Sequence, residues 1–269
     1  EEKSADILVT LAWQDILVEK RWQDISEKLY TVKDRVLENV DSEVVNYISN
    51  NLNSDIKEFS TLSRNPENMV LYKSVIDAEL IYQLYSGDKL KDIITNGVYS
   101  LLQFVRPVET LINKSVRLSE EGLKTRRNIR GKVKAGEYQP LFNRVLQVIE
   151  QDNPAIAQQL NDVFPKSFNN FCNNPYIKQK PDNLNQAAWA LFLELINNPA
   201  HDDELYCLVG LLLEIHVLRN KYLHPLKNTP IDLQYEDDLE YMRYAALKSI
   251  NLILHMDIKG ITRLYFRSR

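Results

Sequence analysis

The chain has 269 residues, enough for one large domain or two of ordinary size, and 44% of them are hydrophobic. Its net charge of −4, from 33 basic and 37 acidic residues, excludes a global attraction to nucleic acid or to an anionic membrane. Only 7 residues are Gly, and strand-rich folds need glycine for their tight turns, so we predict an all-α fold.

The first third of the chain has the apolar period of amphipathic helices. Apolar residues recur every three or four positions from Ile7 to Val32, which predicts a helix pair with charged residues on the opposite face. The same pattern and the local start and stop signals predict three further helices, over 41–52, 70–86 and 89–105. We expect the last of these to end before Pro107, because a proline ring removes a hydrogen-bond donor and clashes with the preceding turn.

A basic segment over 113–140 divides the chain into two parts. Two of the few glycines lie near its end, and we therefore place a domain junction here, between an N-terminal helical region (1–135) and a C-terminal helical domain (136–269). A basic segment can follow a nucleic-acid backbone, although a solvated helix or linker is the commoner alternative. The candidate substrate-binding residues of this segment are Arg126, Arg127 and Arg130.

The C-terminal domain contains the most regular helical patterns of the chain. Apolar spacing predicts two helices, over 141–151 and 153–164, and a segment with three prolines and many asparagines predicts a loop over 165–183. Three strong helices follow, over 186–197, 203–220 and 238–256. The middle one is apolar nearly all round, and we expect it to be the central buried helix of a bundle.

The segment RNKYLH, residues 219–224, ends this apolar helix and directly precedes Pro225. Arg219 supplies a planar guanidinium that matches phosphate oxygens, and His224 can take up or release a proton near neutral pH. Together they fit metal-independent RNA cleavage, in which the imidazole moves a proton to or from the ribose and the guanidinium stabilises the phosphorane. On a straight helix the two side chains would point about 140° apart. We therefore expect a bend before Pro225, or a second copy of the chain that completes the site.

RNKYLHP at the end of a buried helix, followed after a short loop by an amphipathic helix, resembles the HEPN superfamily, whose signature is an Arg, a polar residue and a nearby His. The resemblance covers the C-terminal half of the chain and implies Arg219, Asn220 and His224 as catalytic residues, with Asn220 orienting one of the other two. It implies a helical bundle that forms a homodimer and acts as an endoribonuclease, producing a 2′,3′-cyclic phosphate and a 5′-hydroxyl. Prokaryotic toxins, abortive-infection proteins and CRISPR-associated effectors belong to this superfamily.

Other residues near the motif have two readings each. We include Lys221 and Tyr222 among the candidate substrate-binding residues, Tyr222 because its ring can stack on a base, but packing against a neighbouring helix is equally open to it. His216 shares a face with Arg219, and a satisfied core histidine is favoured over a binding role. We expect no metal and no cofactor, since no histidine has a second ligand at suitable spacing on its helix.

The sequence also bears on location and partners. Cys172 and Cys207 lie far apart, and no run has the roughly 18 to 20 apolar residues of a membrane span, so we expect a cytoplasmic protein without membrane contact. The chain begins EEKSAD, without Met, which suggests a piece of a longer protein. The expected partners are RNA, a second copy of the chain, and an antitoxin or a regulatory or sensor domain. The alternative functions are a non-catalytic helical adaptor and a module that only binds RNA or protein.

Overall fold

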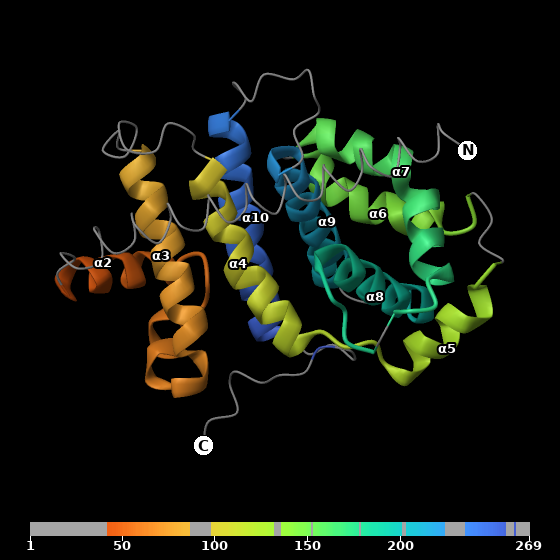
Figure 1. The fold of residues 1–269 in the computed structure, drawn as a ribbon, viewed down its shortest axis with the longest axis horizontal. Coiled ribbons are helices and arrows are strands. Elements are labelled where there is room, and N and C mark those ends of the chain that lie inside the picture. The colour runs from red at the N-terminus through yellow and green to blue at the C-terminus, as the bar shows by residue number, and fades with distance from the viewer. Residues whose placement is uncertain are drawn as a thin grey trace, which may run out of the picture.

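The computed structural model describes residues 42–86, 98–131, 136–151, 153–177, 179–200, 203–223, 235–256 and 261. Within these ranges the protein is all-α, as predicted, and the one β-contact is an isolated bridge between Val116 and Ile261 (Figure 1). The helix pair predicted between Ile7 and Val32 lies outside the described residues. None of the described helices combines the length and the apolar character that a membrane crossing requires.

Helices α2 (Ser42–Leu52) and α3 (Met69–Ser86) form one end of the molecule and agree with the predicted helices over 41–52 and 70–86. Two short 3-10 turns, Phe59–Arg64 and Pro66–Asn68, connect them. Figure 1 shows α4 (Val98–Ser115) between α3 and α10 (Tyr235–His255), and it packs against both. The N-terminal helices are therefore joined to the C-terminal ones through α4 and through direct contacts with α10, such as Arg243 with Glu79.

Pro107 lies inside α4, and the prediction that the helix ends before it is wrong. A proline in a helix interior costs roughly 3 kcal/mol. Apolar residues on both sides of it, including Phe104, Val108 and Leu111, are fully buried between α3 and α10. Burial of this face offsets the lost hydrogen bond, because most helical stability in proteins comes from tertiary packing.

The basic segment over 113–140 contains the short helix α5 (Glu120–Ile129). Ser119 is its N-cap, with Oγ accepting a hydrogen bond from the amide of Gly122 at 2.9 Å, and two glutamates in the first turn complement the helix dipole. The helix packs against α7 (Pro154–Asn173) and α8 (Leu184–Asn197). One hydrophobic core contains residues from both sides of position 135, so the two predicted regions share an interior.

Helices α6 (Gln139–Glu150) and α7 (Pro154–Asn173) follow, and α7 corrects the sequence analysis. Its second half covers the start of the predicted loop over 165–183, with Pro165 inside the helix. Phe164, Phe168 and Phe171 return at helical spacing on its buried face. The first two belong to an aromatic cluster with Phe142, Trp189 and Phe192, whose burial holds the segment helical in spite of the proline and the asparagines.

The prediction of a central buried helix is confirmed by α9 (Asp203–Leu223), which packs against α4, α6, α7, α8 (Leu184–Asn197) and α10. In Figure 1 it lies between α10 on one side and α6 to α8 on the other. Gly210 permits the approach of α6, because a Cβ atom at this position would lie 3.1 Å from the carbonyl oxygen of Val145. The last turn of α9 carries the RNKYL part of the motif.

Candidate functional site

Arg219 lies near the end of α9 and faces α4. Its Nε atom is 3.6 Å from Oε1 of Glu109, and the two side chains are 30% and 34% exposed. This separation makes an ion pair but is too long for a hydrogen bond. Among the described residues, the Arg219 guanidinium has no hydrogen bond and no second ion pair. The partly exposed guanidinium therefore keeps N–H groups that no described residue binds.

Glu109, in the second half of α4, is a residue that the sequence analysis missed. Burial raises the pKa of its carboxyl above the ordinary value, and the positive charge of Arg219 opposes that increase. Glu109 has no motif around it and lies far from RNKYLH in the sequence. Only the packing of α4 against α9 brings Glu109 to Arg219, so the sequence alone does not indicate it.

Asn220 is paired with His216, one helical turn earlier, with 3.0 Å between the amide nitrogen and Nε2 of the ring. Burial and then the charge of Arg219 lower the pKa of His216 to about 4. The imidazole is therefore neutral near pH 7, and its Nε2 accepts a hydrogen bond from the Asn220 amide. His216 is thus a hydrogen-bonded, partly buried histidine, and the described partner of Asn220 is His216 rather than Arg219.

Lys221 and Tyr222 both donate hydrogen bonds to Oδ2 of Asp238, at the start of α10. Tyr222 is 5% exposed, and burial followed by the hydrogen bond to Asp238 raises the pKa of its hydroxyl. In the structure Tyr222 therefore packs against the neighbouring helix α10, which is one of the two interpretations that the sequence left open. Lys221 is half exposed, and its Nζ also lies over the Tyr222 ring.

The three arginines of the basic segment differ in exposure. Arg126 is 9% exposed, and its guanidinium donates hydrogen bonds to the carbonyl oxygens of Phe171 and Asn174, which connects α5 to the end of α7. Burial lowers the pKa of this guanidinium. Its donors face the interior of the protein, whereas Arg127 and Arg130 are exposed. The structure does not bring any of the three beside Arg219 through a described contact.

His224 and Pro225 lie outside the described residues, and the described α9 ends at Leu223. The relation of His224 to Arg219 therefore comes from the sequence alone. Among the other histidines, His255 contacts the carbonyl oxygen of Lys57, and His201 is outside the described ranges. In the part of the chain that the structure describes, no three His, Cys, Asp or Glu side chains are grouped as metal ligands. Burial raises the pKa of the Cys172 thiol to about 12.

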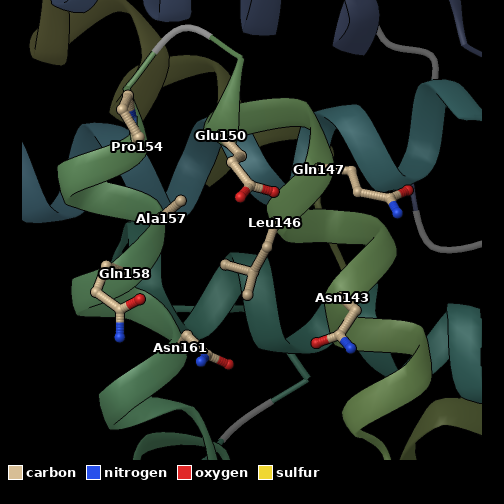
Figure 2. A pocket seen from close by; sticks show the side chains of 8 residues that line it. All are labelled: Asn143, Leu146, Gln147, Glu150, Pro154, Ala157, Gln158 and Asn161. Atoms are coloured by element: carbon tan, nitrogen blue, oxygen red, sulfur yellow. The ribbon is translucent and has the colours of Figure 1, made fainter.

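An open groove of about 290 Å³ lies between α6 and α7, away from the residues predicted for RNA cleavage. Figure 2 shows four amide side chains, a carboxylate and three apolar side chains along it. Gln139 spans the two helices nearby, with Nε2 donating to Asn143 at 2.9 Å and to Asn161 at 2.8 Å. The lining residues are Asn143, Leu146, Gln147, Glu150, Pro154, Ala157, Gln158 and Asn161.

Neither a protein-family model, nor a curated protein, nor a solved structure matches this chain. The relation to the HEPN superfamily is therefore a resemblance that rests on RNKYLHP and on the helix that carries it.

Proposed function

We propose that the protein is a metal-independent endoribonuclease that cleaves RNA through attack of a ribose 2′-hydroxyl on the adjacent phosphate. The observation that supports the proposal best is the environment of the Arg219 side chain and its place in the central helix. It is a partly exposed guanidinium with one loose ion pair and no hydrogen bond among the described residues. It also stands at the end of the central helix, five positions before His224 in the sequence.

Two arginines of the described fold, Arg243 and Arg144, are bound more tightly than Arg219. Arg243 makes short contacts with Glu79 at 2.8 Å and Asp55 at 3.1 Å, and Arg144 binds Asp203 at 3.0 Å and the hydroxyl of Tyr206 at 2.9 Å. A guanidinium that is already hydrogen-bonded must lose those bonds to bind a phosphate, which costs affinity. Arg219 has no such bonds to lose within the described residues, so it is a better phosphate ligand than Arg144 or Arg243; unlike the exposed Arg127 and Arg130, it also lies in RNKYLH.

In the proposed reaction Arg219 binds the scissile phosphate and stabilises the charge of the phosphorane. His224 is a proton-transfer group, and Asn220, held by His216, is a neighbouring donor for a substrate oxygen. The O2′–P bond forms and the P–O5′ bond breaks, which leaves a 2′,3′-cyclic phosphate and a 5′-hydroxyl. A homodimer with RNKYLH at its interface is part of the proposal, because a second copy can bring its own His224 toward Arg219.

The second candidate function is a non-catalytic helical adaptor or RNA-binding module. The contacts of Lys221 and Tyr222 with Asp238 favour it, because they give this half of RNKYLH a role in closing α9 onto α10. The two functions differ in whether RNA is cut, and a cleavage assay separates them.

The test is incubation of labelled single-stranded RNA with the protein in EDTA. The wild-type protein, Arg219→Gln, His224→Ala and a control, Arg144→Gln, are compared. We expect wild-type and control proteins to yield 2′,3′-cyclic phosphate ends, and the two motif variants to lose activity by about 10²- to 10³-fold. A substrate with a 2′-deoxy sugar at the scissile position should resist cleavage. Cleavage that EDTA abolishes, or that both motif variants retain, contradicts the proposal; RNA binding without any cleavage supports the second candidate.

A further inference from the structure

Cleavage through the 2′-hydroxyl requires two proton transfers in each turnover. A base takes the proton of the attacking 2′-hydroxyl, and an acid gives one to the leaving 5′-oxygen. A single imidazole in one protonation state serves as one of these, not both at once. With one His224 beside each Arg219, whichever copy of the chain supplies it, the proposed reaction has a role for a second titratable group beside Arg219.

Glu109 is the carboxylate that the described structure brings to Arg219. It comes from a different helix, α4, and it is about as exposed as Arg219, so both groups are open to the same solvent region. At 3.6 Å and without a hydrogen bond, this pair differs from the tight contacts that Arg243 makes with Glu79 and Asp55. A partly exposed pair of this kind contributes little to stability.

We propose that Glu109 is a further catalytic residue, the general base that accepts the proton of the ribose 2′-hydroxyl, and this inference rests on the proposed endoribonuclease function. Oε1 of Glu109 lies 3.6 Å from Nε of Arg219, and the guanidinium makes no hydrogen bond with the described residues, so its Nη groups can bind the phosphate. Carboxylate and phosphate then lie at adjacent edges of one planar cation. The ribose attached to the phosphate is thereby within reach of the carboxylate.

The step balances with the groups named. The 2′-hydroxyl proton passes to the carboxylate of Glu109 as the O2′–P bond forms. The P–O5′ bond breaks, and the imidazolium of His224 gives its proton to the 5′-oxygen. The carboxylic acid and the neutral imidazole then exchange protons with water, which restores the starting state.

The surroundings of Glu109 suit this role. Burial raises the pKa of Glu109, which makes the carboxylate a stronger base, and the charge of Arg219 opposes that increase. His216, on the same face of α9 as Arg219, has a pKa of about 4, and its Nε2 is bonded to Asn220. This imidazole is a weak base with its lone pair engaged, so it is a poorer candidate for the same proton.

The test compares pH–rate profiles of RNA cleavage by the wild-type protein, Glu109→Gln, Glu109→Ala and the control Asp55→Asn. The control removes another partly exposed carboxylate from an ion pair with an arginine, Arg243. Glu109→Gln should lower the cleavage rate by about 10²- to 10⁴-fold and abolish the rise in rate on the acid side of the profile. Formate should restore part of the activity of Glu109→Ala, because a small carboxylate can enter the vacated space. Asp55→Asn should cleave as the wild type does.

The outcomes separate the two proposals. A wild-type protein that does not cleave RNA overturns the endoribonuclease function and with it the role of Glu109. If the wild-type protein cleaves RNA, and Glu109→Gln keeps the same rate and the same rise on the acid side of its pH–rate profile, only the role of Glu109 is overturned. A slower Glu109→Gln that keeps the acid limb, together with a Glu109→Ala that formate does not rescue, also overturns it, since that result describes a residue that only shapes the site.

Discussion

Oε1 of Glu109 lies 3.6 Å from Nε of Arg219, and this ion pair connects the middle of α4 to the last turns of the central helix α9. The two residues are far apart in the sequence and on different helices. Their pairing gives the region around RNKYLH a carboxylate and a guanidinium that both face solvent, a combination suited to proton transfer beside a phosphate.

The first prediction concerns the strength of this pair. A double-mutant cycle with Arg219→Gln, Glu109→Gln and the double variant should give a coupling energy below about 1 kcal/mol, because both groups are about one-third exposed and the contact is long. Urea unfolding at low and high salt measures it. A coupling of several kcal/mol would show that Arg219 is committed to holding α4, and would count against an available guanidinium.

The second prediction concerns Asp238, which accepts hydrogen bonds from Tyr222 and Lys221. Asp238→Ala should lower the free energy of unfolding by about 1 to 3 kcal/mol, because the buried Tyr222 hydroxyl loses its hydrogen bond to Asp238. Adding Tyr222→Phe to Asp238→Ala should recover part of this loss. Denaturant unfolding of the two variants gives both numbers, and a double variant less stable than Asp238→Ala would contradict the assignment.

The third prediction concerns the pH dependence of stability. The pKa of His216 is lowered from 6.5 to about 4 in the folded protein, so the unfolded chain binds the proton first as pH falls. The contribution of this residue to stability is complete above pH 6.5 and is lost as pH falls toward 4, by about 3 kcal/mol at most. His216→Gln, which keeps a hydrogen-bonding group near Asn220, should lose less stability over this window. The free energy of unfolding of both proteins is measured at several pH values. If it falls equally in the two proteins as pH is lowered, His216 is not the cause of the loss.

The fourth prediction concerns Gly210, where α6 crosses α9. A Cβ atom here would meet the carbonyl oxygen of Val145 at 3.1 Å and a side-chain carbon of Ile149 at 3.3 Å. Gly210→Val should destabilise the protein by about 1 to 3 kcal/mol, because a backbone oxygen cannot move aside as a side chain can. Valine favours a helix more than glycine does, so intrinsic propensity acts in the opposite direction. A variant with an unchanged melting temperature would show that α6 and α9 can separate at little cost.

The helices of the described fold follow from local patterns in the sequence. The predicted helix over 70–86 is α3, and the apolar helix over 203–220 is α9, which lies at the centre as expected. Prolines were misread, at Pro107 in α4 and Pro165 in α7. In both places the burial of an apolar face stabilises the helix on either side of the proline. The local sequence does not reveal how much tertiary packing a segment gains.

The candidate site likewise contains some residues that the sequence indicates and others that it does not. The order of residues in RNKYLH predicts Arg219 and Asn220 as site residues, because a short motif is a local feature. Glu109 was missed, and Arg126 was grouped with Arg127 and Arg130 although it alone is buried. A run of positive charge does not show which member turns inward, since that depends on which carbonyl oxygens a neighbouring helix presents.

The sequence by itself determined the helical class, the central position of α9 and the chemistry available in RNKYLH. Only the tertiary structure decided that a carboxylate from α4 stands beside Arg219, that His216 holds Asn220, and that Asp238 holds Tyr222. The physical reason is that helical periodicity is a property of neighbouring residues. The distance between side chains of different helices, by contrast, depends on how the whole core packs.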